Sequence, residues 1–254
     1  MIEKSFMRLA CAMASCMMMA SASAGDAIPL NWPIPEVPKD ANSATFARPC
    51  NDWMQKFERN CARTKAGPVD LLFLGDSITE GWRGSPVWNE FYGKLNAAPY
   101  GISGDHTENL IWRIQNGEID GLSPKLIVIL IGTNNFGFNT SAQIAEGVMA
   151  VADEAKKRCP GSTILIMGVF PRGEKASDPV RAKVAEINKL LAESSASRPV
   201  KFMDIGKAFL SQDGSISKEL MYDFLHPSAK GQRVWAEQIQ PEVSKALGSQ
   251  AILK

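Results

Sequence analysis

Ser77 stands in a sequence context that could make it a nucleophile. It directly follows the apolar run 71–74 and the pair Gly75-Asp76. Such a run predicts a buried parallel strand, and the turn after it would place the serine hydroxyl at the carboxyl edge of a sheet, where α/β enzymes build their sites. The backbone amides of the helix start that follows would favour developing negative charge. The alternative is a serine that only caps a helix, which a lone Gly-Asp-Ser does not exclude.

An aspartate and a histidine near the other end of the chain could serve this serine. Asp223 and His226 are three residues apart, which is close enough for the carboxylate to orient the imidazole ring. Because an imidazole titrates near neutral pH, it suits a general base. The residue types therefore predict acyl transfer to Ser77, with His226 as base and Asp223 as its partner. A surface histidine before the last helix is the alternative.

Two polar turns between these ends also follow predicted strands, at 103–105 and 132–135. Gly104 has no side chain in front of its amide, and the carboxamide of Asn134 can donate a hydrogen bond. With the amide of Ser77, these groups could form an oxyanion hole. Each turn alone could be ordinary turn chemistry, but their order along the chain favours a site.

The elements that must position these residues alternate along the chain. Apolar runs predict strands at 70–74, 98–102, 126–131, 163–169 and 200–203, and helical patterns cover 52–63, 107–115, 141–157, 179–194 and 228–246. Runs without period-two alternation are typical of strands buried on both faces, and helices between them imply parallel crossovers. The pattern therefore predicts an α/β protein, a three-layer α/β/α sandwich with a five-stranded parallel sheet.

Composition limits the class of partner. The 254 residues are 45% hydrophobic, which is enough for one sizeable core, and their formal net charge is only +1. Nothing in this balance favours nucleic acid or an anionic membrane surface. We therefore expect a small molecule as the partner, and acyl transfer to Ser77 would make it an ester.

The first residues are typical of an export signal. Two basic residues precede the apolar run 9–20, and residues 22–24 have the small-x-small form of a cleavage site. The run is shorter than the roughly 20 apolar residues of a spanning helix. We therefore expect residues 1–24 to be a cleaved signal peptide of a secreted or periplasmic protein, with no stable membrane insertion. A lipid anchor at Cys16 is less favoured, because the residues before it match a lipoprotein site poorly.

The segment 25–66 is predicted to be an N-terminal arm followed by a helix, ahead of a catalytic domain at 67–248. Its first part carries prolines at 29, 33, 35 and 38 and has little periodicity, which is typical of extended chain. Gly67-Pro68 then interrupts the chain before the first strand.

Loss of the leader would leave Cys50, Cys61 and Cys159, an odd number for an oxidising compartment. Their pairing stays open. An unbroken helix would hold Cys50 and Cys61 roughly 16 Å apart, beyond the ~7 Å limit for a disulfide. None of the three lies in a Cys-x-x-Cys or a Cys-and-His cluster, so we expect no metal, and acyl transfer needs no cofactor.

Four motifs taken together resemble the sequence blocks of the SGNH (GDSL-type) hydrolases. They are Gly75–Thr79, Gly104, Gly132–Asn135 and Asp223-x-x-His226. Within that family, residues 101–105, 112–118, 171–175 and 223–226 are similar to the catalytic subunits of brain-type platelet-activating-factor acetylhydrolase.

The resemblance implies the flavodoxin-like fold of SGNH hydrolases, with Ser77 as nucleophile, His226 as base and Asp223 as its partner. It assigns the oxyanion hole to the Ser77 amide, the Gly104 amide and the Asn134 side chain, and it leaves a homodimer open. The chain departs from that group in its leader, in its proline-rich arm and in His106, where a small hydroxyl residue would be expected.

Residues beside the blocks are candidate substrate contacts: Asp76, His106, Asn135, Phe136, Phe224 and Leu225. For Asp76 we favour a structural role, in which its carboxylate fixes the turn through backbone amides. An exposed loop histidine is the alternative for His106.

These observations together predict a serine esterase that cleaves short acyl groups, above all acetyl, through a covalent acyl-enzyme. Export favours acetylated carbohydrates or small exogenous esters as substrates. The alternatives are an O-acyltransferase that passes the same acyl group to a sugar hydroxyl, and a lipase or lysophospholipase. The complete set of site residues argues against a non-catalytic binding module.

Overall fold

Five parallel strands form the centre of the protein in the computed structural model, which describes residues 51–248. The strands are β1 (Leu71–Gly75), β2 (Ala97–Gly101), β3 (Leu126–Leu130), β4 (Thr163–Met167) and β5 (Lys201–Met203). They lie in the order β2-β1-β3-β4-β5, and every neighbouring pair is parallel.

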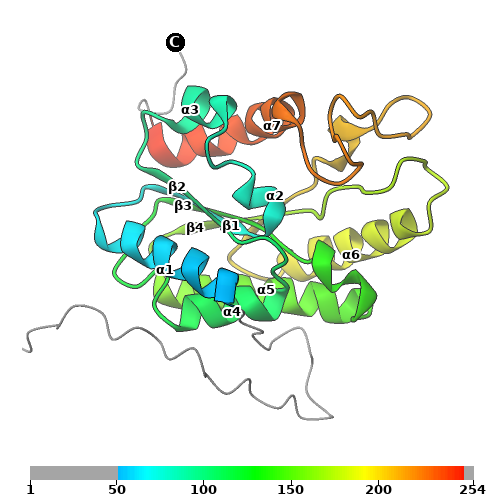
Figure 1. Ribbon diagram of the computed structural model, residues 1–254. Coiled ribbons are helices and arrows are strands. Elements are labelled where there is room, and N and C mark those ends of the chain that lie inside the picture. The colour runs from blue at the N-terminus through cyan, green and yellow to red at the C-terminus, as the bar shows by residue number, and fades with distance from the viewer. Residues whose placement is uncertain (1–50, 249–254) are drawn as a thin grey trace, which may run out of the picture. The chain divides into compact units, whose positions relative to one another are not determined.

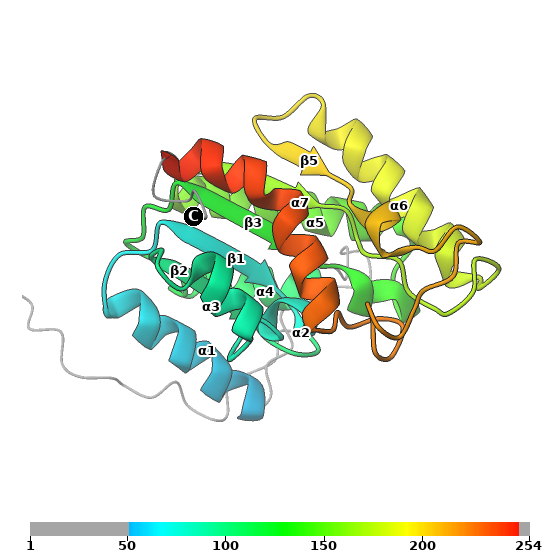
Figure 2. The same cartoon turned by 90° about the horizontal axis from the view of Figure 1, so that it is seen from above.

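Helices cover both faces of this sheet (Figure 1). The helices are α1 (Asn51–Lys65), α2 (Ser77–Glu80), α3 (Pro86–Tyr92), α4 (Thr107–Gln115), α5 (Ser141–Arg158), α6 (Val180–Ser195) and α7 (Ala229–Leu247), with two 3₁₀ turns, η2 (Thr133–Gly137) and η3 (Gly206–Phe209). Helices α3 and α7 lie on one face and α4, α5 and α6 on the other, as Figure 2 shows from above. The predicted three-layer α/β/α sandwich with a five-stranded parallel sheet is confirmed.

Alternating strand residues divide the core into two halves. Leu72 and Leu74 of β1 pack with residues of α4, α5 and α6, whereas Leu71 and Phe73 pack with residues of α3 and α7. All four side chains are fully buried. Strands buried on both faces cannot show polar alternation, which explains their unbroken apolar runs.

The register of the strands brings three turns to one edge of the sheet. Gly75 at the end of β1 pairs with Gly101 of β2 on one side and with Leu130 of β3 on the other. The chain therefore leaves these three neighbouring strands at the same level. The turns after them carry Ser77, Gly104 and Asn134.

Helix α3 is the element that the apolar pattern missed. Ser85 is its N-cap, and the Ser85 hydroxyl accepts hydrogen bonds from the amides of Val87 (3.2 Å) and Trp88 (3.4 Å). Pro86 occupies the first turn, where a missing amide hydrogen costs nothing. The helix is too short for a clear helical period, but a serine followed by a proline was a usable signal.

Helix α1 is longer than the predicted 52–63 and packs on the domain. Its Trp53 and Phe57 are buried, and both rings contact Trp112 of α4. Cys61 lies within this unbroken helix, while Cys50 lies outside the described residues.

The predicted leader 1–24 and the proline-rich part of the arm also lie outside the described residues. Of the helices that the structure describes, none is both long enough and apolar enough to cross a bilayer.

Candidate active site

Ser77 begins helix α2 directly after the end of strand β1. Asp76 is the N-cap of α2, and its Oδ1 accepts a hydrogen bond from the Ile78 amide at 3.0 Å. Asp76 therefore fixes the turn, as we favoured from the sequence. Gly75 allows the end of β3 to approach closely here, because a Cβ at this position would lie 2.3 Å from the Leu130 carbonyl oxygen.

Three side chains from two distant parts of the sequence form a hydrogen-bonded chain at this edge. The Ser77 hydroxyl lies 2.8 Å from Nε2 of His226, and Nδ1 of the same ring lies 2.7 Å from Oδ2 of Asp223. This is the order of contacts that proton transfer from a serine to a carboxylate-oriented imidazole requires.

The Asp223 carboxylate is held by its own loop. Its Oδ1 accepts hydrogen bonds from the amides of His226 (2.7 Å) and Leu225 (3.1 Å). Burial acts to raise the pKa of Asp223, but the hydrogen bonds and charge of His226 and the Leu225 amide together hold it below its ordinary value. Asp223 therefore stays ionised at neutral pH and can stabilise a protonated ring.

Phe224 carries the strain of this loop. Its φ is +61°, in a region that a bulky residue rarely adopts. Its carbonyl accepts a hydrogen bond from the Gly173 amide at 3.0 Å. Phe224 and Leu225, both predicted to contact substrate, are half-buried and pack against the core cluster that includes residues of α7. Only part of each side chain is open to solvent.

The predicted oxyanion donors lie on the neighbouring turns. Gly104 is exposed and has a φ of +83°, which explains the glycine. The Asn134 amide nitrogen donates to the carbonyl of Asp105 at 2.8 Å. Because a carboxamide nitrogen carries two hydrogens, one of them stays available for a ligand.

Asp76 differs electrostatically from Asp223. Its side chain is buried, and burial raises the pKa of its carboxyl to about 6, against the lowering effect of the Ile78 amide. Its Oδ2 has no hydrogen-bond partner in the described part of the chain. A carboxyl this far inside is not placed to contact a substrate.

Asn135 lies behind the site and not in it. The side chain is fully buried, its Oδ1 accepts from the Thr107 amide, and its nitrogen donates to Glu108 (3.0 Å) and Asn139 (3.1 Å). Our expectation of a substrate contact is wrong for this residue, because its hydrogen bonds fix the turn that carries Asn134.

His106 and Phe136 lie at the rim of the site. The Nδ1 atom of His106 lies 3.2 Å from the buried carboxylate of Glu108, and its ring contacts the ring of Phe138. Phe136 is half-buried, with the guanidinium of Arg172 5.5 Å from its ring centre.

Sequence reasoning missed two groups of residues around the site. The first is a buried ionic cluster of Arg113, Asp105 and Glu118, to which the indole of Trp53 is hydrogen-bonded through Asp105. The second is Tyr222, which is exposed and stacks on the ring of His226. The only signal in the sequence for the ionic cluster was the presence of charged residues in segments that are otherwise apolar or rich in turns.

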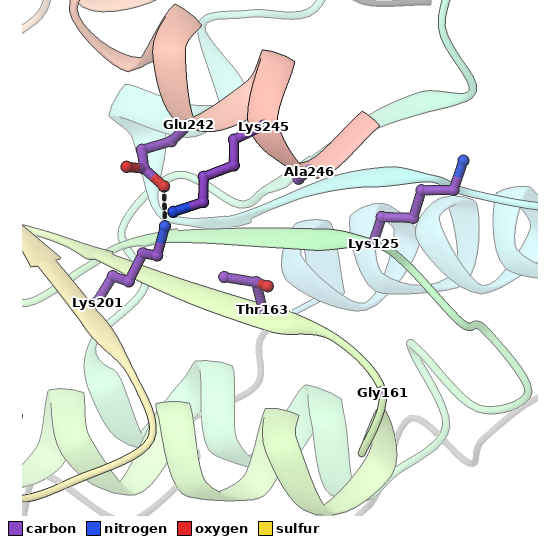
Figure 3. A pocket seen from close by; sticks show the side chains of 7 residues that line it. All are labelled: Lys125, Gly161, Thr163, Lys201, Glu242, Lys245 and Ala246. Atoms are coloured by element: carbon purple, nitrogen blue, oxygen red, sulfur yellow. Dashed lines mark hydrogen bonds and ion pairs between the residues drawn. The ribbon is translucent and has the colours of Figure 1, made fainter. Parts of the chain in front are cut away.

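A hollow of about 410 Å³ lies away from this site (Figure 3). Residues from the amino ends of β3, β4 and β5 and from the end of α7 line it, so it opens at the opposite edge of the sheet from Ser77. Lys201 and Glu242 in its wall pair with each other, and Lys125 pairs with Asp70. Across residues 51–248, no group of three or more His, Cys, Asp or Glu side chains is placed to hold a metal ion.

Comparisons with known proteins agree with the geometry. Residues 73–234 match the model of the GDSL-like Lipase/Acylhydrolase family. The platelet-activating factor acetylhydrolase IB subunit alpha2 of Gallus gallus is 36% identical over 194 residues, which are 74% of this chain and 84% of that protein.

Two solved structures show the same fold. A GDSL-like lipase from Bacteroides thetaiotaomicron superposes with a TM-score of 0.63 at 20% identity, over 75% of this chain and 98% of that one. An acetylxylan esterase from Geobacillus stearothermophilus gives a TM-score of 0.55 at 20% identity, over 68% of this chain and 93% of that one.

Proposed function

Since the chain belongs to the GDSL-like lipase/acylhydrolase family and is a carboxylic ester hydrolase, we propose that Ser77, His226 and Asp223 are its catalytic triad. The hydrogen-bonded chain from Ser77 through His226 to Asp223 is the observation that carries this proposal. The contact between Ser77 and His226 joins residues 149 positions apart, so local turn chemistry does not account for it.

The first half of the reaction forms an acyl-enzyme. The Ser77 oxygen attacks the ester carbonyl carbon while Nε2 of His226 takes the hydroxyl proton, and the ionised Asp223 stabilises the resulting imidazolium. The carbonyl oxygen becomes an oxyanion, which accepts hydrogen bonds from the amides of Ser77 and Gly104 and from the Asn134 carboxamide. The C–O bond to the alcohol then breaks, and the alcohol leaves with the proton from His226.

The second half repeats these steps with water. His226 takes a proton from the water, the hydroxide oxygen attacks the acyl carbon, and the Ser77 oxygen leaves with the proton. The products are the free carboxylic acid and the regenerated serine. A sugar hydroxyl in place of water would give the O-acyltransferase reaction through the same intermediate.

We propose further that the acyl group is acetyl and that the alcohol is part of a carbohydrate. Support for acetyl comes from the names of an acetylhydrolase relative and an acetylxylan esterase neighbour. Support for a carbohydrate comes from two large hydrophobic side chains that are exposed, Phe138 (66%) and Tyr222 (59%), which contact the rings of His106 and His226. Exposed aromatic faces next to the proposed base and next to the turn of Gly104 suit the apolar C–H faces of sugar rings.

The test compares acetylated xylo-oligosaccharides with p-nitrophenyl acetate as substrates. We expect Phe138→Ala to lower kcat/KM for the sugar ester while leaving that for p-nitrophenyl acetate within about twofold, since the small ester does not reach the ring. An equal loss on both substrates, or no release of acetate from the sugar by the wild type, would contradict the carbohydrate assignment. Transfer of the acetyl group to an added sugar in preference to water would instead favour the acyltransferase.

Export is the remaining part of the proposal. The basic residues and apolar run of the leader, with the Ala22-Ser23-Ala24 motif, support secretion or release into a periplasm. N-terminal sequencing of the exported protein should give a start near Gly25. A retained Met1 on protein from that compartment would argue against it.

A further inference from the structure

Asp105 connects the two predicted oxyanion donors, Gly104 and Asn134, to the interior of the protein. It directly follows Gly104, and its backbone carbonyl accepts the hydrogen bond from Asn134. Its carboxylate is fully buried, with Oδ1 bound to the indole N–H of Trp53 and Oδ2 at 2.8 Å from Nη2 of Arg113. One residue thus fixes the positions of both Gly104 and Asn134.

Arg113 connects this loop to the strand that carries the nucleophile. Its fully buried guanidinium donates to the carbonyl of Gly75 at 3.0 Å and to the carbonyl of Tyr100 at 3.1 Å. Gly75 is two residues before Ser77, and Tyr100 is near the end of the strand that leads to Gly104. The same planar group therefore bridges the ends of two strands that the β1–β2 ladder already pairs.

We propose that the Arg113–Asp105 ion pair, fixed by Trp53 of α1, is a positioning device that holds the oxyanion donors in register with Ser77. This inference rests on the proposed roles of Gly104 and Asn134. Trp53 lies outside the segment 73–234 that matches the family model, so the family motifs do not include this hydrogen bond.

The outer end of the same loop has a separate anchor. Glu80 of α2 accepts hydrogen bonds from both the amide (2.7 Å) and the hydroxyl (2.5 Å) of Ser103. With Ser103 tied to α2 and Asp105 tied to α1 and α4, Gly104 stands between two fixed residues. The contacts of these two neighbours then hold the positive φ of Gly104, which has no side chain to make contacts itself.

The charges around Asp105 make the device sensitive to pH. Burial raises the pKa of Asp105 to about 7, the Arg113 charge and the Trp53 N–H act to lower it, and the nearby Glu118 acts to raise it. Loss of the Trp53 hydrogen bond would raise the pKa of Asp105 further. Protonation would then weaken the ion pair at a higher pH than in the wild type.

The test is Trp53→Phe, which keeps an aromatic ring against Phe57 and Trp112 but removes the indole N–H. We expect kcat for p-nitrophenyl acetate to fall about tenfold with KM little changed, and the acidic limb of the kcat profile to move to higher pH. Phe57→Leu is the matched control: it loosens the same aromatic cluster but carries no hydrogen bond to Asp105, so it should lower Tm and leave kcat and its pH profile unchanged.

Asp105→Asn provides the second variant. It keeps the size of the side chain but removes the charge that pairs with Arg113, and we expect a larger loss of kcat than in Trp53→Phe. Wild-type kcat and pH profile in both variants would overturn the proposal, as would a kcat loss in Phe57→Leu equal to that in Trp53→Phe. A wild-type protein without esterase activity would overturn the proposed function itself. Failure of the proposed function can therefore be told apart from failure of the positioning proposal.

Discussion

Two aspartates lie close to Ser77, and their surroundings give them opposite ionisation behaviour. Asp223 accepts backbone and ring hydrogen bonds, which hold its pKa below the ordinary value, whereas burial raises the pKa of Asp76 to about 6. An orienting carboxylate must be ionised while the imidazole is protonated. At the residue scale, this difference favours Asp223 over Asp76 as the partner of His226.

The proposed oxyanion hole can be tested at a single side chain. Asn134→Ala should lower kcat about 10²–10³-fold and change KM little, because the donor acts on a charge that exists only in the transition state. Steady-state kinetics with p-nitrophenyl acetate measures both constants. Damage confined to KM would make Asn134 a binding residue.

The raised pKa of Asp76 predicts a pH-dependent effect on stability. Folding moves this pKa from 3.8 to about 6, so the folded state binds the proton more tightly, and ionisation destabilises the fold increasingly between these two values. At about 1.4 kcal/mol per pKa unit, the full cost above pH 6 is about 3 kcal/mol. Asp76→Asn keeps the oxygen that caps α2 but cannot ionise.

We therefore expect the Tm of Asp76→Asn, relative to wild type, to rise between pH 4 and pH 7. Thermal melts of both proteins at several pH values measure this difference. A difference in Tm that is the same at pH 4 and pH 7 would show that the Asp76 carboxyl is not destabilised by burial.

At the scale of elements, the site depends on loops that brace one another. The loop 168–179 after β4 supports the loop 210–228 that carries Asp223 and His226: the Gly173 amide donates to Phe224, and the Ile216 amide donates to Glu174 at 2.9 Å. These bonds compensate for the strained φ of Phe224 and keep His226 within reach of Ser77.

The buried cluster around Arg113 should also stabilise the fold. Arg113→Met would leave the carboxylates of Asp105 and Glu118 inside the protein without their cation, at a cost of about 3–5 kcal/mol. Urea denaturation should show a lower midpoint. Lys189→Met is the control, because Lys189 belongs to an exposed pair with Glu193 and should change the midpoint little. Equal midpoints for both variants would contradict the role of the cluster.

Several elements could be predicted from the sequence because their signals are local. Strands β1, β3 and β4 show as nearly unbroken apolar runs, and the motifs after β1, β2 and β3 show as polar turns. The strand predicted at 163–169 ends at Met167, because the apolar residues continue past the last ladder hydrogen bonds. The contacts of Trp53 and Arg113 could not be predicted. The partner of Trp53 is distant in sequence, and the acidic partners of Arg113 lie in turns that show neither helical nor strand periodicity.

At the scale of the whole molecule, the two edges of the sheet differ. The 410 Å³ hollow lies at the amino edge, while the proposed triad lies at the carboxyl edge among the turns. The order of the four motifs predicted which edge carries the chemistry, because parallel strands put all their following turns on one side. Which side chains would be exposed there, Phe138 and Tyr222 in particular, depends on tertiary packing and had no signal in the sequence.

The architecture predicts a preference for short acyl groups. The long loops at the carboxyl edge are bonded to each other, and we expect neither to form an apolar channel above Ser77. A methylene that fits an apolar pocket adds at most about 0.8 kcal/mol, whereas one that meets packed side chains costs roughly 1–3 kcal/mol. The ratio kcat/KM for p-nitrophenyl esters should therefore fall steeply beyond butyrate. A maximum at octanoate or longer would favour a lipase or lysophospholipase.

The central claim is that Ser77 is the nucleophile, and covalent labelling tests it most directly. A fluorophosphonate probe reacts with a serine whose hydroxyl is activated by a base, so peptide mass spectrometry of the labelled wild type should find one adduct, on Ser77, with loss of esterase activity in parallel. The Ser77→Ala variant should take up no probe and show no turnover while its circular dichroism is unchanged. An adduct on another residue, or a Ser77→Ala variant that keeps more than a few per cent of wild-type turnover, would contradict the account.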